Sequence, residues 1–449
     1  MIEHRPHQSS TPRSLVTTPT KIPLQFVNFR LNLRETMVVE ESGGDAVVII
    51  REYNPKTDSE RVEQVERSCE VGPSGEYSLH ADLLGDPVCR VRNSPAYLML
   101  VAETVVNDGG DETREVVGMI RGCIKTVTCG RKLYRKANFS PELRPVFTKL
   151  AYILGLRVSP THRRMKIGLK LVSGMEDWFR DNGAEYSYIA TDAANKPSVN
   201  LFTGKCGYTK FRNPSVLVHP VFAHRLRVNH RVKIIKLSPS DAETIYRRRF
   251  STTEFFPRDI DSVLKNNLNL GTFLAVPKDC PHSISWVGSE QFLLDPPESW
   301  AIMSVWNCND VFKLEVKGAS KLRKGFVNTT RVLDRIFPFL NLPSLPKIFN
   351  PFGLHLLYGL GGEGPCYLKF AKALFGFAHN LAKEHNCGVV ATEVSSEDPL
   401  KLVIPHWKVL SFADLWCIKR LDEDYSDGFI GDWRKSQPDL SFFLDPREF

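Results

Sequence analysis

The chain has 449 residues and a mass of 50.9 kDa, more than one folding domain usually contains, so its length predicts roughly two or three folded units. A hydrophobic fraction of 42% and a charged fraction of 24% are typical of packed proteins and exclude a fibrous or wholly disordered chain. The longest apolar runs, such as 97–102, fall far short of the roughly 20 residues that span a bilayer, so we expect a soluble protein without a membrane partner. The net charge of +8 permits an anionic ligand without requiring one.

The N-terminal segment 1–40 contains many Ser, Thr, Pro and Arg residues, and it lacks the apolar core of a secretory signal. This composition favours a disordered leader. An organelle-targeting peptide is the alternative, because such peptides are rich in Arg and Ser and poor in acids. We therefore expect an intracellular protein of the nucleus or cytoplasm, with organelle targeting left open.

Ten cysteines are spread from Cys69 to Cys417 without a CxxC pair. They predict neither a disulfide framework nor a zinc site, since both need closely spaced cysteines. We expect reduced, buried thiols and no metal.

Regular structure is predicted from residue 46 onward. The β-branched run 46–52 predicts a strand, and Val62 and Val65 share one face of a predicted helix at 58–69. The runs 97–102 and 115–125 predict strands of a β-hairpin, separated by the turn-forming residues 107–110.

A strand–helix–strand unit follows this hairpin. Residues 150–158 and 186–191 predict strands, and apolar residues at helical spacing between Ile167 and Phe179 predict a helix that ends at Gly183. Such a unit implies that its two strands are parallel neighbours.

The second half of the chain repeats this order of elements. Its predicted strands are 232–239, 271–276, 300–306, 312–316, 354–360 and 388–393, and its predicted helices are 241–246 and 370–381. An internal duplication explains the repeat. It predicts one domain at 46–215, a second at 230–449 with an insertion at 319–351, and a boundary within 211–231.

The loop that leads into the helix at 167 is strongly basic. Residues 157–170 include no acid and contain five cations, namely Arg157, Arg163, Arg164, Lys166 and Lys170. Cationic side chains beside the amide groups of a helix N-terminus are suited to a diphosphate. A solvated basic face is the alternative that these residues leave open.

Two stretches around this loop resemble motifs of the GNAT acetyltransferases. The run Arg163-Arg164-Met165-Lys166-Ile167-Gly168, after 154–160, resembles motif A, whose pattern is Arg or Gln, two residues, Gly, one residue, and Gly or Ala. The residues that resemble motif B are Asn195, Ser198, Leu201, Phe202, Gly207 and Tyr208. From about Val48 to the C-terminus, the chain is also similar to the plant HOOKLESS-type group of N-acetyltransferases, with matching stretches at 69–75, 251–259 and 445–449.

This resemblance implies an α/β (α+β) fold of tandem GNAT-like domains, each a mixed twisted sheet whose central parallel strand pair is flanked by helices. It also implies acetyl-CoA as the cosubstrate, bound in a V-shaped opening between the strands 150–158 and 186–191. The residues implied to bind acetyl-CoA are Leu156, Arg157, Val158, Arg163, Arg164, Met165, Lys166, Ile167, Gly168 and Asn195. In this scheme the backbone of Leu156 and Val158 and the side chain of Asn195 hold pantetheine, and the amides of 163–168 hold the pyrophosphate.

Two residues depart from the GNAT pattern. Lys166 stands where motif A has its first glycine, and Phe202 stands where many members have a tyrosine that protonates the leaving thiolate. Transfer to an amine needs a base, and Tyr152 and Glu103 are the candidate catalytic residues. Their alternatives are a packed strand aromatic and a solvated glutamate at the end of a strand.

The second half replaces the basic loop with the Gly-rich run 361–365. Pro365 lacks an amide donor and Glu363 repels phosphate, so we predict a non-catalytic domain that shapes the acceptor groove of the first. The acidic stretch from Asp422 to Asp432 is predicted to attract a basic acceptor.

The sequence thus predicts an acetyl-CoA-dependent N-acetyltransferase in which an amine attacks directly, without a covalent enzyme intermediate. A protein lysine, a protein N-terminus and a small amine all stay open as acceptors. The alternative is a regulatory protein that keeps the GNAT fold with weak or no catalysis. Nucleic-acid binding is not favoured, because no binding motif is recognised, and the resemblance implies a role in plant growth or hormone response.

Overall fold

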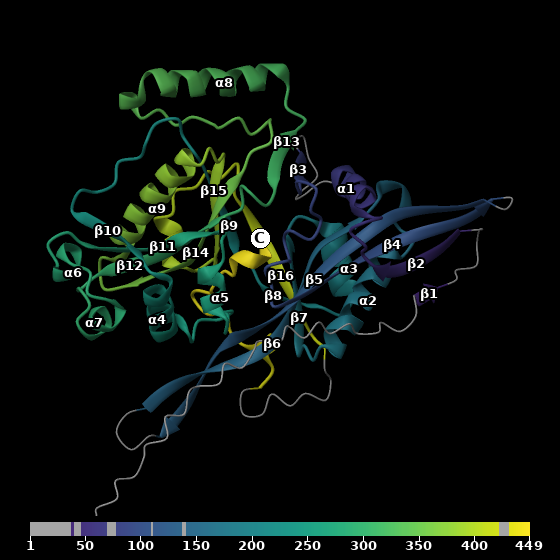
Figure 1. Ribbon diagram of the computed structural model, residues 1–449, viewed down its shortest axis with the longest axis horizontal. Helices are drawn as coiled ribbons and strands as arrows, with labels where there is room; N and C mark the ends of the chain where they lie inside the picture. The colour runs from purple at the N-terminus through teal and green to yellow at the C-terminus, as the bar shows by residue number, and fades with distance from the viewer. Residues whose placement is uncertain (1–36, 40–45, 70–77, 109–110, 137–140, 422–430) are drawn as a thin grey trace, which may run out of the picture. The chain divides into compact units, whose positions relative to one another are not determined.

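The computed structural model describes residues 37–39, 46–69, 78–108, 111–136, 141–421 and 431–449 (Figure 1). Residues 37–449 form one compact unit. Of the predicted leader at 1–40, Met37–Val39 is described, and it forms strand β1 paired with β2 (Ala46–Glu52). None of the described helices is long and apolar enough to cross a membrane.

The first half of the chain builds a sheet in the order β1-β2-β4-β5-β6-β7. The further strands are β4 (Ala96–Asp108), β5 (Asp111–Lys136), β6 (Pro141–Val158) and β7 (Tyr186–Asp192). β6 and β7 are parallel, as predicted, and the other neighbours are antiparallel. β5 and β6 are longer than the sequence predicts, because they continue to pair with each other as far as Lys136 and Pro141.

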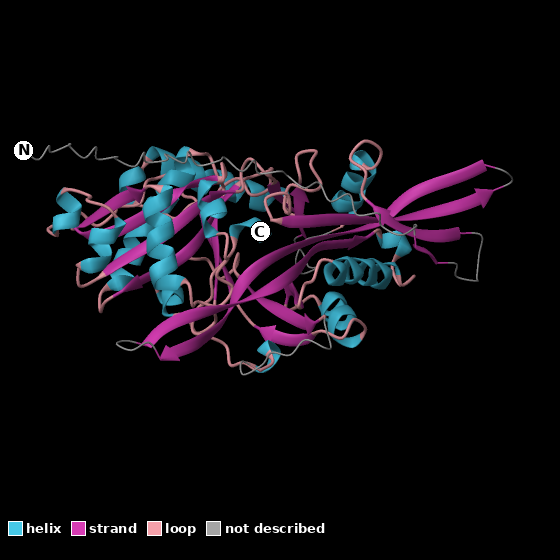
Figure 2. Ribbon diagram, turned by 60° about the horizontal axis from the view of Figure 1, so that its bottom comes forward, coloured by secondary structure: helices cyan, strands magenta, loops and turns pink. Residues whose placement is uncertain are grey.

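Helices cover both sides of these strands (Figure 2). α1 (Ser59–Ser68) packs against one face, and α2 (Ile167–Asp181) packs its apolar stripe against the other. α2 lies close to β5, because a Cβ atom at Gly122 would overlap Met175 and Phe179. α3 (Lys196–Gly204) follows β7 and packs with α2 in the same core.

The second half repeats this plan in the order β15-β14-β12-β11-β10. Its strands are β10 (Val232–Leu237), β11 (Asn269–Pro277), β12 (Trp300–Asn307), β14 (Leu354–Glu363) and β15 (Val389–Val394). β14 and β15 are parallel, and α4 (Pro239–Phe250) and α9 (Tyr367–Glu384) belong to separate cores of this half. Each half therefore has a mixed sheet with a parallel pair and flanking helices, which confirms the predicted fold class.

One predicted strand pairs differently from its expected role in the repeat. β13 (Lys313–Lys317) does not extend the second sheet; it pairs antiparallel with β3 (Ser78–Asp82) of the first half in a separate two-stranded sheet. The other described helices of the second half are α5 (Ile260–Lys265), α6 (Pro281–Ile284), α7 (Ser289–Leu294) and α8 (Lys321–Ile336). α8 falls within the predicted insertion.

The halves exchange strands at the centre of the sheet. β16 (Phe412–Arg420), near the end of the chain, pairs antiparallel with β7 and with β8 (Thr209–Arg212) of the first half. β9 (Ser215–Pro220) lies within the predicted boundary, and it pairs with β15 of the second half. β9 and β16 also pair with each other, so one 14-stranded sheet runs through both halves. The two-domain division of the chain stays a prediction.

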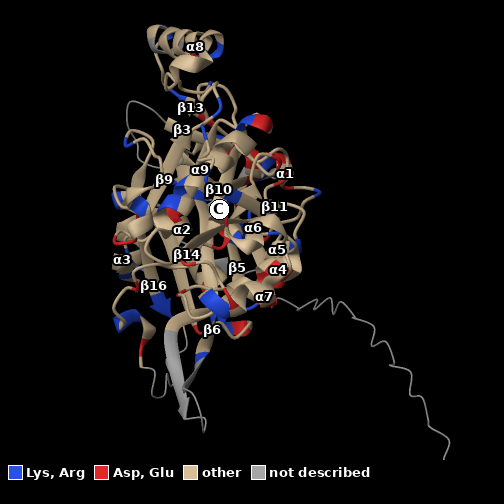
Figure 3. Cartoon of the chain, turned by 90° about the vertical axis from the view of Figure 1, so that its left-hand side faces the viewer, with Lys and Arg blue, Asp and Glu red and all other residues tan. Residues whose placement is uncertain are grey.

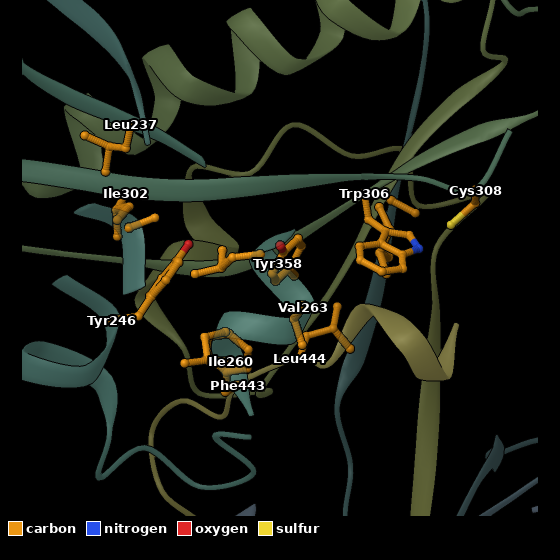
Figure 4. Packing of buried hydrophobic residues seen from close by; sticks show 14 of the residues in the cluster. Leu237, Tyr246, Ile260, Val263, Ile302, Trp306, Cys308, Tyr358, Phe443 and Leu444 are labelled. Atoms are coloured by element: carbon orange, nitrogen blue, oxygen red, sulfur yellow. The ribbon is translucent and has the colours of Figure 1, made fainter. Parts of the chain in front are cut away.

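The C-terminal segment is buried between the halves. Phe443 and Leu444 join the core of the second half beside Tyr246 and Tyr358 (Figure 4). A few residues later, the Glu448 carboxylate lies 2.6 Å from the buried Nζ of Lys125 on β5. The last residues therefore connect the second core to the first sheet.

All ten cysteines lie in the described part of the chain and are free. Eight are buried, as predicted, whereas Cys280 is partly exposed and Cys366 is exposed.

Candidate functional site

The parallel strands β6 and β7 part from each other after a short contact. Their pairing runs from Leu150 with Tyr186 to Ile153 with Ile189. Directly beyond it, β6 has a bulge at Gly155, whose φ of +63° lies in the left-handed region. From residue 154 onward, no described strand pairs with the β7 side of β6. The two strands therefore separate where the resemblance implies the opening.

A buried arginine explains why this bulge has a glycine. A Cβ atom at Gly155 would overlap the guanidinium of Arg121. Arg121 is fully buried, and its Nη2 donates to Glu66 at 3.1 Å while its Nε donates to the Pro87 carbonyl. The ion pair between β5 and α1 therefore restricts position 155 to a residue without a side chain.

The basic loop leads from the opening to the N-terminus of α2. Its exposed residues include Arg163, Arg164, Met165 and Lys166, whereas Ile167 is buried in the core. Arg163 and Arg164 form no ion pair within the described residues. Ile167 can therefore offer a ligand only its backbone, while the two arginines can offer side chains.

Lys166 keeps a conformation that usually needs a glycine. Its φ is +58° and that of Arg164 is +67°, so both lie in the left-handed region. The replacement of the first motif glycine by Lys166 therefore leaves the backbone in a glycine-like conformation at the start of α2.

Gly168 lies beside the part of β6 that pairs with β5 but not with β7. A Cβ atom built there would be 3.5 Å from Leu201 of α3, 3.8 Å from Val158 and 3.9 Å from Leu156. These are ordinary contact distances, so an alanine fits at Gly168 and a larger side chain would enter the space beside β6. The structure thus brings together three of the predicted binding residues, namely Leu156, Val158 and Gly168.

The side chains of Arg157 and Asn195 form hydrogen bonds within the protein that the sequence did not indicate. The Nε of Arg157 donates to Glu66 at 3.3 Å, on the α1 side of the sheet. The Oδ1 of Asn195 accepts a hydrogen bond from the amide of Ser198 at 3.3 Å and caps α3. The role of either side chain in binding acetyl-CoA stays a prediction.

Tyr152 is buried at the base of the opening. Its ring stacks on Tyr188 with centroids 4.5 Å apart, and burial raises its pKa well above the ordinary value. The Tyr188 hydroxyl donates to Glu448 at 2.6 Å. A phenol that stays protonated can donate a proton but cannot accept one, so this environment favours the packed-aromatic alternative over a base.

Glu103 lies on β4, two strands away from β6. It is buried and accepts hydrogen bonds from Arg51 at 3.0 and 3.1 Å. These bonds, the largest cause, hold the pKa of Glu103 below its ordinary value. In this environment Glu103 is better explained as a structural ion-pair partner of Arg51. Neither the catalytic base nor the solvated glutamate that was its alternative fits as well.

Phe202 occupies the motif B position with a buried ring that packs edge-on against Tyr208 at 5.3 Å. The Tyr208 hydroxyl is 2.9 Å from Ser187 Oγ. Burial raises the pKa of Tyr208 well above its ordinary value. Position 202 therefore offers no hydroxyl to a leaving group.

Three acids near the opening are absent from the sequence prediction. Asp192 ends β7, Asp414 lies opposite it in β16, and Glu393 lies near the end of β15. The similar runs Ala190-Thr191-Asp192 and Ala391-Thr392-Glu393 end corresponding strands of the two halves and are a sequence signal for two of these acids, but nothing local marks Asp414. Strand exchange brings these residues together.

The second half has the same bulge, but protein side chains fill the space between its parallel strands β14 and β15. Gly359 of β14 has a φ of +59°, and its missing Cβ makes room for the Tyr246 hydroxyl. Thr392 Oγ1 donates to the Leu357 carbonyl at 2.8 Å, across the pair of strands. Phe250 fills the space beside Gly361. These contacts leave little room for a ligand and support a non-catalytic second half, which stays a prediction.

The chain is similar to known acetyltransferases. The profile of the "Acetyltransferase (GNAT) family" matches residues 64–208, which contain the opening and the basic loop. "Probable N-acetyltransferase HLS1" of Arabidopsis thaliana is 64% identical over 408 residues, covering 90% of this chain and 100% of that protein. "Acetyl transferase GW6a" of Oryza sativa subsp. japonica is 37% identical over 441 residues, covering 90% of this chain and 98% of that protein. A crystal structure of a GCN5-related N-acetyltransferase from Kribbella flavida aligns at 16% identity with a TM-score of 0.40, over 84% of this chain and 71% of that one.

The chain belongs to the GNAT family of acetyltransferases. The identity to full-length relatives and the family match over the first half confirm the resemblance found in the sequence.

Proposed function

We propose that this protein transfers the acetyl group of acetyl-CoA to an amine, and that the opening between β6 and β7 is the site of transfer. The observation that carries this proposal is the parting of two parallel strands immediately before a basic loop and a helix N-terminus. The amides of the pantetheine arm and the diphosphate each find complementary groups along this one segment.

The diphosphate end has the strongest chemical match. Arg163 and Arg164 are exposed cations without ion-pair partners among the described residues, and α2 directs its first amide groups and its positive dipole end toward the same loop. The left-handed backbone at Lys166 gives the amides there a glycine-like orientation. The unpaired edge of β6 at Leu156 and Val158 is suited to the pantetheine amides.

The reaction needs a neutral amine next to the thioester carbonyl. The nitrogen lone pair forms the new C–N bond, the C–S bond breaks, and the thiolate leaves with the electron pair and is protonated. The amine that supplies the lone pair is a protein lysine, a protein N-terminus or a small amine. The described basic and acidic residues are interspersed over the elements (Figure 3), which supports a local anion site over an extended nucleic-acid surface.

Titration calorimetry with acetyl-CoA tests the site. Gly168→Ala adds a Cβ at ordinary contact distance from Leu201, so acetyl-CoA affinity should stay within about threefold. Gly168→Leu fills the space beside Val158 and should lower the affinity by at least about tenfold. Circular dichroism of both variants checks that they are folded. Absence of acetyl-CoA binding by the unaltered protein would defeat the proposal.

Phe202 is the observation that favours the second candidate, a GNAT-fold regulator with weak or no catalysis. Its buried ring offers no acid for the thiolate. Release of free CoA from acetyl-CoA, measured over a panel of amines and peptides, separates the two functions, because sustained amine-dependent release excludes a non-catalytic protein. A growth-regulating role and a nuclear or cytoplasmic location stay predictions.

A further inference from the structure

Three carboxyl groups from three strands meet where the halves exchange strands. Asp192 and Asp414 are directly opposite each other in the antiparallel pair of β7 and β16. β16 pairs at Ala413 with β9, and β9 pairs at Val216 with Glu393 of β15. Two of the three acids thus come from the second half of the chain, although they lie beside the opening of the first.

These acids lie on the acceptor side of the opening. Side chains alternate along β7, so Tyr188 and Asp192 share one face, and cross-strand partners place Tyr152 and Asp414 on that face too. α2 packs on the opposite face. Asp192 is three residues, or about 10 Å, past the last pair between β6 and β7.

The three carboxyl groups accept few hydrogen bonds from described residues. Glu393 Oε1 accepts from Trp416 Nε1 at 3.0 Å, and Asp192 Oδ1 accepts from the Ala194 amide at 2.7 Å. The Oδ2 atom of Asp192 is buried without a hydrogen-bond partner in the described structure, and Asp192 is 8% exposed. The Asp414 carboxyl forms no hydrogen bond or ion pair with any described residue.

Among the described residues, no cation forms an ion pair with Asp192, Glu393 or Asp414. The ionisable groups that interact with Asp414 are Asp192 of β7, Glu393 of β15 and the phenol of Tyr152 on β6, and all three are acids. Glu448 acts on Glu393 and Tyr152, and the charge of the buried Arg90 acts on Tyr152. Buried acids without a cation repel one another when ionised and favour an incoming positive charge. An alkylammonium group has the required charge and up to three N–H donors for the free oxygens.

The ionisation of these acids matches a proton transfer near neutral pH. Burial, and then the charge of Asp192, raise the pKa of Asp414 to about 7. Burial, and then Asp414, raise the pKa of Glu393 well above its ordinary value, so Glu393 stays protonated. Asp414 therefore exchanges a proton near neutral pH.

We propose that Asp414, supplied by the exchanged strand β16, accepts the proton of the acceptor ammonium at the opening between β6 and β7, with Asp192 as the second carboxyl that orients it. This inference rests on the proposed acetyl transfer. The ammonium gives one proton to Asp414 and becomes a neutral amine. As the amine attacks, the C–N bond forms, the C–S bond breaks, and the second proton of the nitrogen goes to the thiolate; Asp414 then returns its proton to solvent.

The pH profile of kcat/KM is the first test. Acetyl-CoA is used with three amine probes, a lysine peptide, a peptide with a free N-terminus and a polyamine. Asp414→Asn should lower kcat at pH 7 by about 10²-fold or more and remove the limb near pH 7, with acetyl-CoA affinity by calorimetry unchanged. Asp414→Glu, which keeps a carboxyl, should restore part of the turnover. Asp279→Asn, an exposed acid in the loop after β11, is the matched control and should leave the profile unchanged.

A stability measurement tests the same residue without an acceptor. The folded-state pKa of Asp414, about 7, exceeds the roughly 3.9 of an unfolded chain, so ionisation of Asp414 destabilises the fold as pH rises through this window. Asp414→Asn should therefore raise the urea midpoint at pH 8 and leave it nearly unchanged at pH 4. Unaltered turnover and pH profile in Asp414→Asn, or no pH-dependent gain in stability, would overturn the assignment. Absence of turnover by the unaltered protein with every probe counts instead against the proposed function.

Discussion

The left-handed backbone at Lys166 makes a quantitative prediction about the departure from motif A. We compare Lys166→Ala with Lys166→Gly, because both remove the same ammonium group and differ only at Cβ. A non-glycine residue at a φ of +58° is strained by about 1–2 kcal/mol. Glycine loses about 0.4–1 kcal/mol more backbone entropy on folding. The net expectation is that Lys166→Gly is more stable than Lys166→Ala by about 0.5–1 kcal/mol.

Met165 provides a control with the opposite sign. It lies between two left-handed residues but has no positive φ itself. Met165→Gly should therefore be less stable than Met165→Ala by about 0.4–1 kcal/mol, since the entropy cost is not offset by relief of strain. Urea denaturation followed by tryptophan fluorescence measures both differences.

Acetyl-CoA binding completes this test. If the backbone at 166 is already oriented for phosphate, calorimetry should give Lys166→Gly an affinity equal to or above that of Lys166→Ala. The reasoning is refuted if the two Lys166 variants are equally stable, or if the Met165 pair changes in the same direction as the Lys166 pair.

Three further sets of variants test contacts of the fold by urea denaturation. Arg212 donates to Glu254 at 2.7 and 3.1 Å, so Glu254→Ala leaves a buried cation without its carboxylate and should lower the free energy of unfolding by about 3–5 kcal/mol. Glu243→Ala breaks a surface ion pair with Arg247 and should lower it by about 0.5 kcal/mol or less. Equal losses of stability in the two variants would contradict this reasoning. Gly155→Ala should cost more than Gly183→Ala, because both have a positive φ but only the first overlaps Arg121; similar costs would show that Arg121 moves freely. Glu103→Gln should be less stable than the unaltered protein by about 1–3 kcal/mol at pH 7, and the gap should close as pH falls through the lowered folded-state pKa of Glu103, because its stabilisation requires the ionised form. Acetyl transfer should survive this change, and its loss would restore Glu103 as a base.

Local patterns in the sequence were sufficient for most elements. The stripe from Ile167 to Phe179 predicted α2, and the β-branched run 46–52 predicted β2 with the observed bounds. Both signals depend on residues a few positions apart, and the same is true of the motif around Gly168. The family and the position of the opening could therefore be read without a structure.

Contacts between distant residues could not be read in this way. The pairing of β16 with β7 joins residues far apart in sequence, and no periodicity in 412–420 indicates which edge it completes. Glu103 looked like a candidate base because Arg51, 52 positions earlier, is not visible as its partner in the sequence. Asp414 was missed for the same reason, since its environment is made by three separate strands.

The exchange of β9 and β16 has a consequence for synthesis of the chain on the ribosome. When β7 leaves the ribosome, its partner β16 has not yet been made, because almost all of the second half is translated first. At roughly 5–20 residues per second, the edge of β7 waits about 10–40 s for its neighbour. During that interval its unpaired N–H and C=O groups can template pairing with another nascent chain. The first half alone should consequently need a chaperone or aggregate, whereas the complete chain covers this edge with its own last long strand.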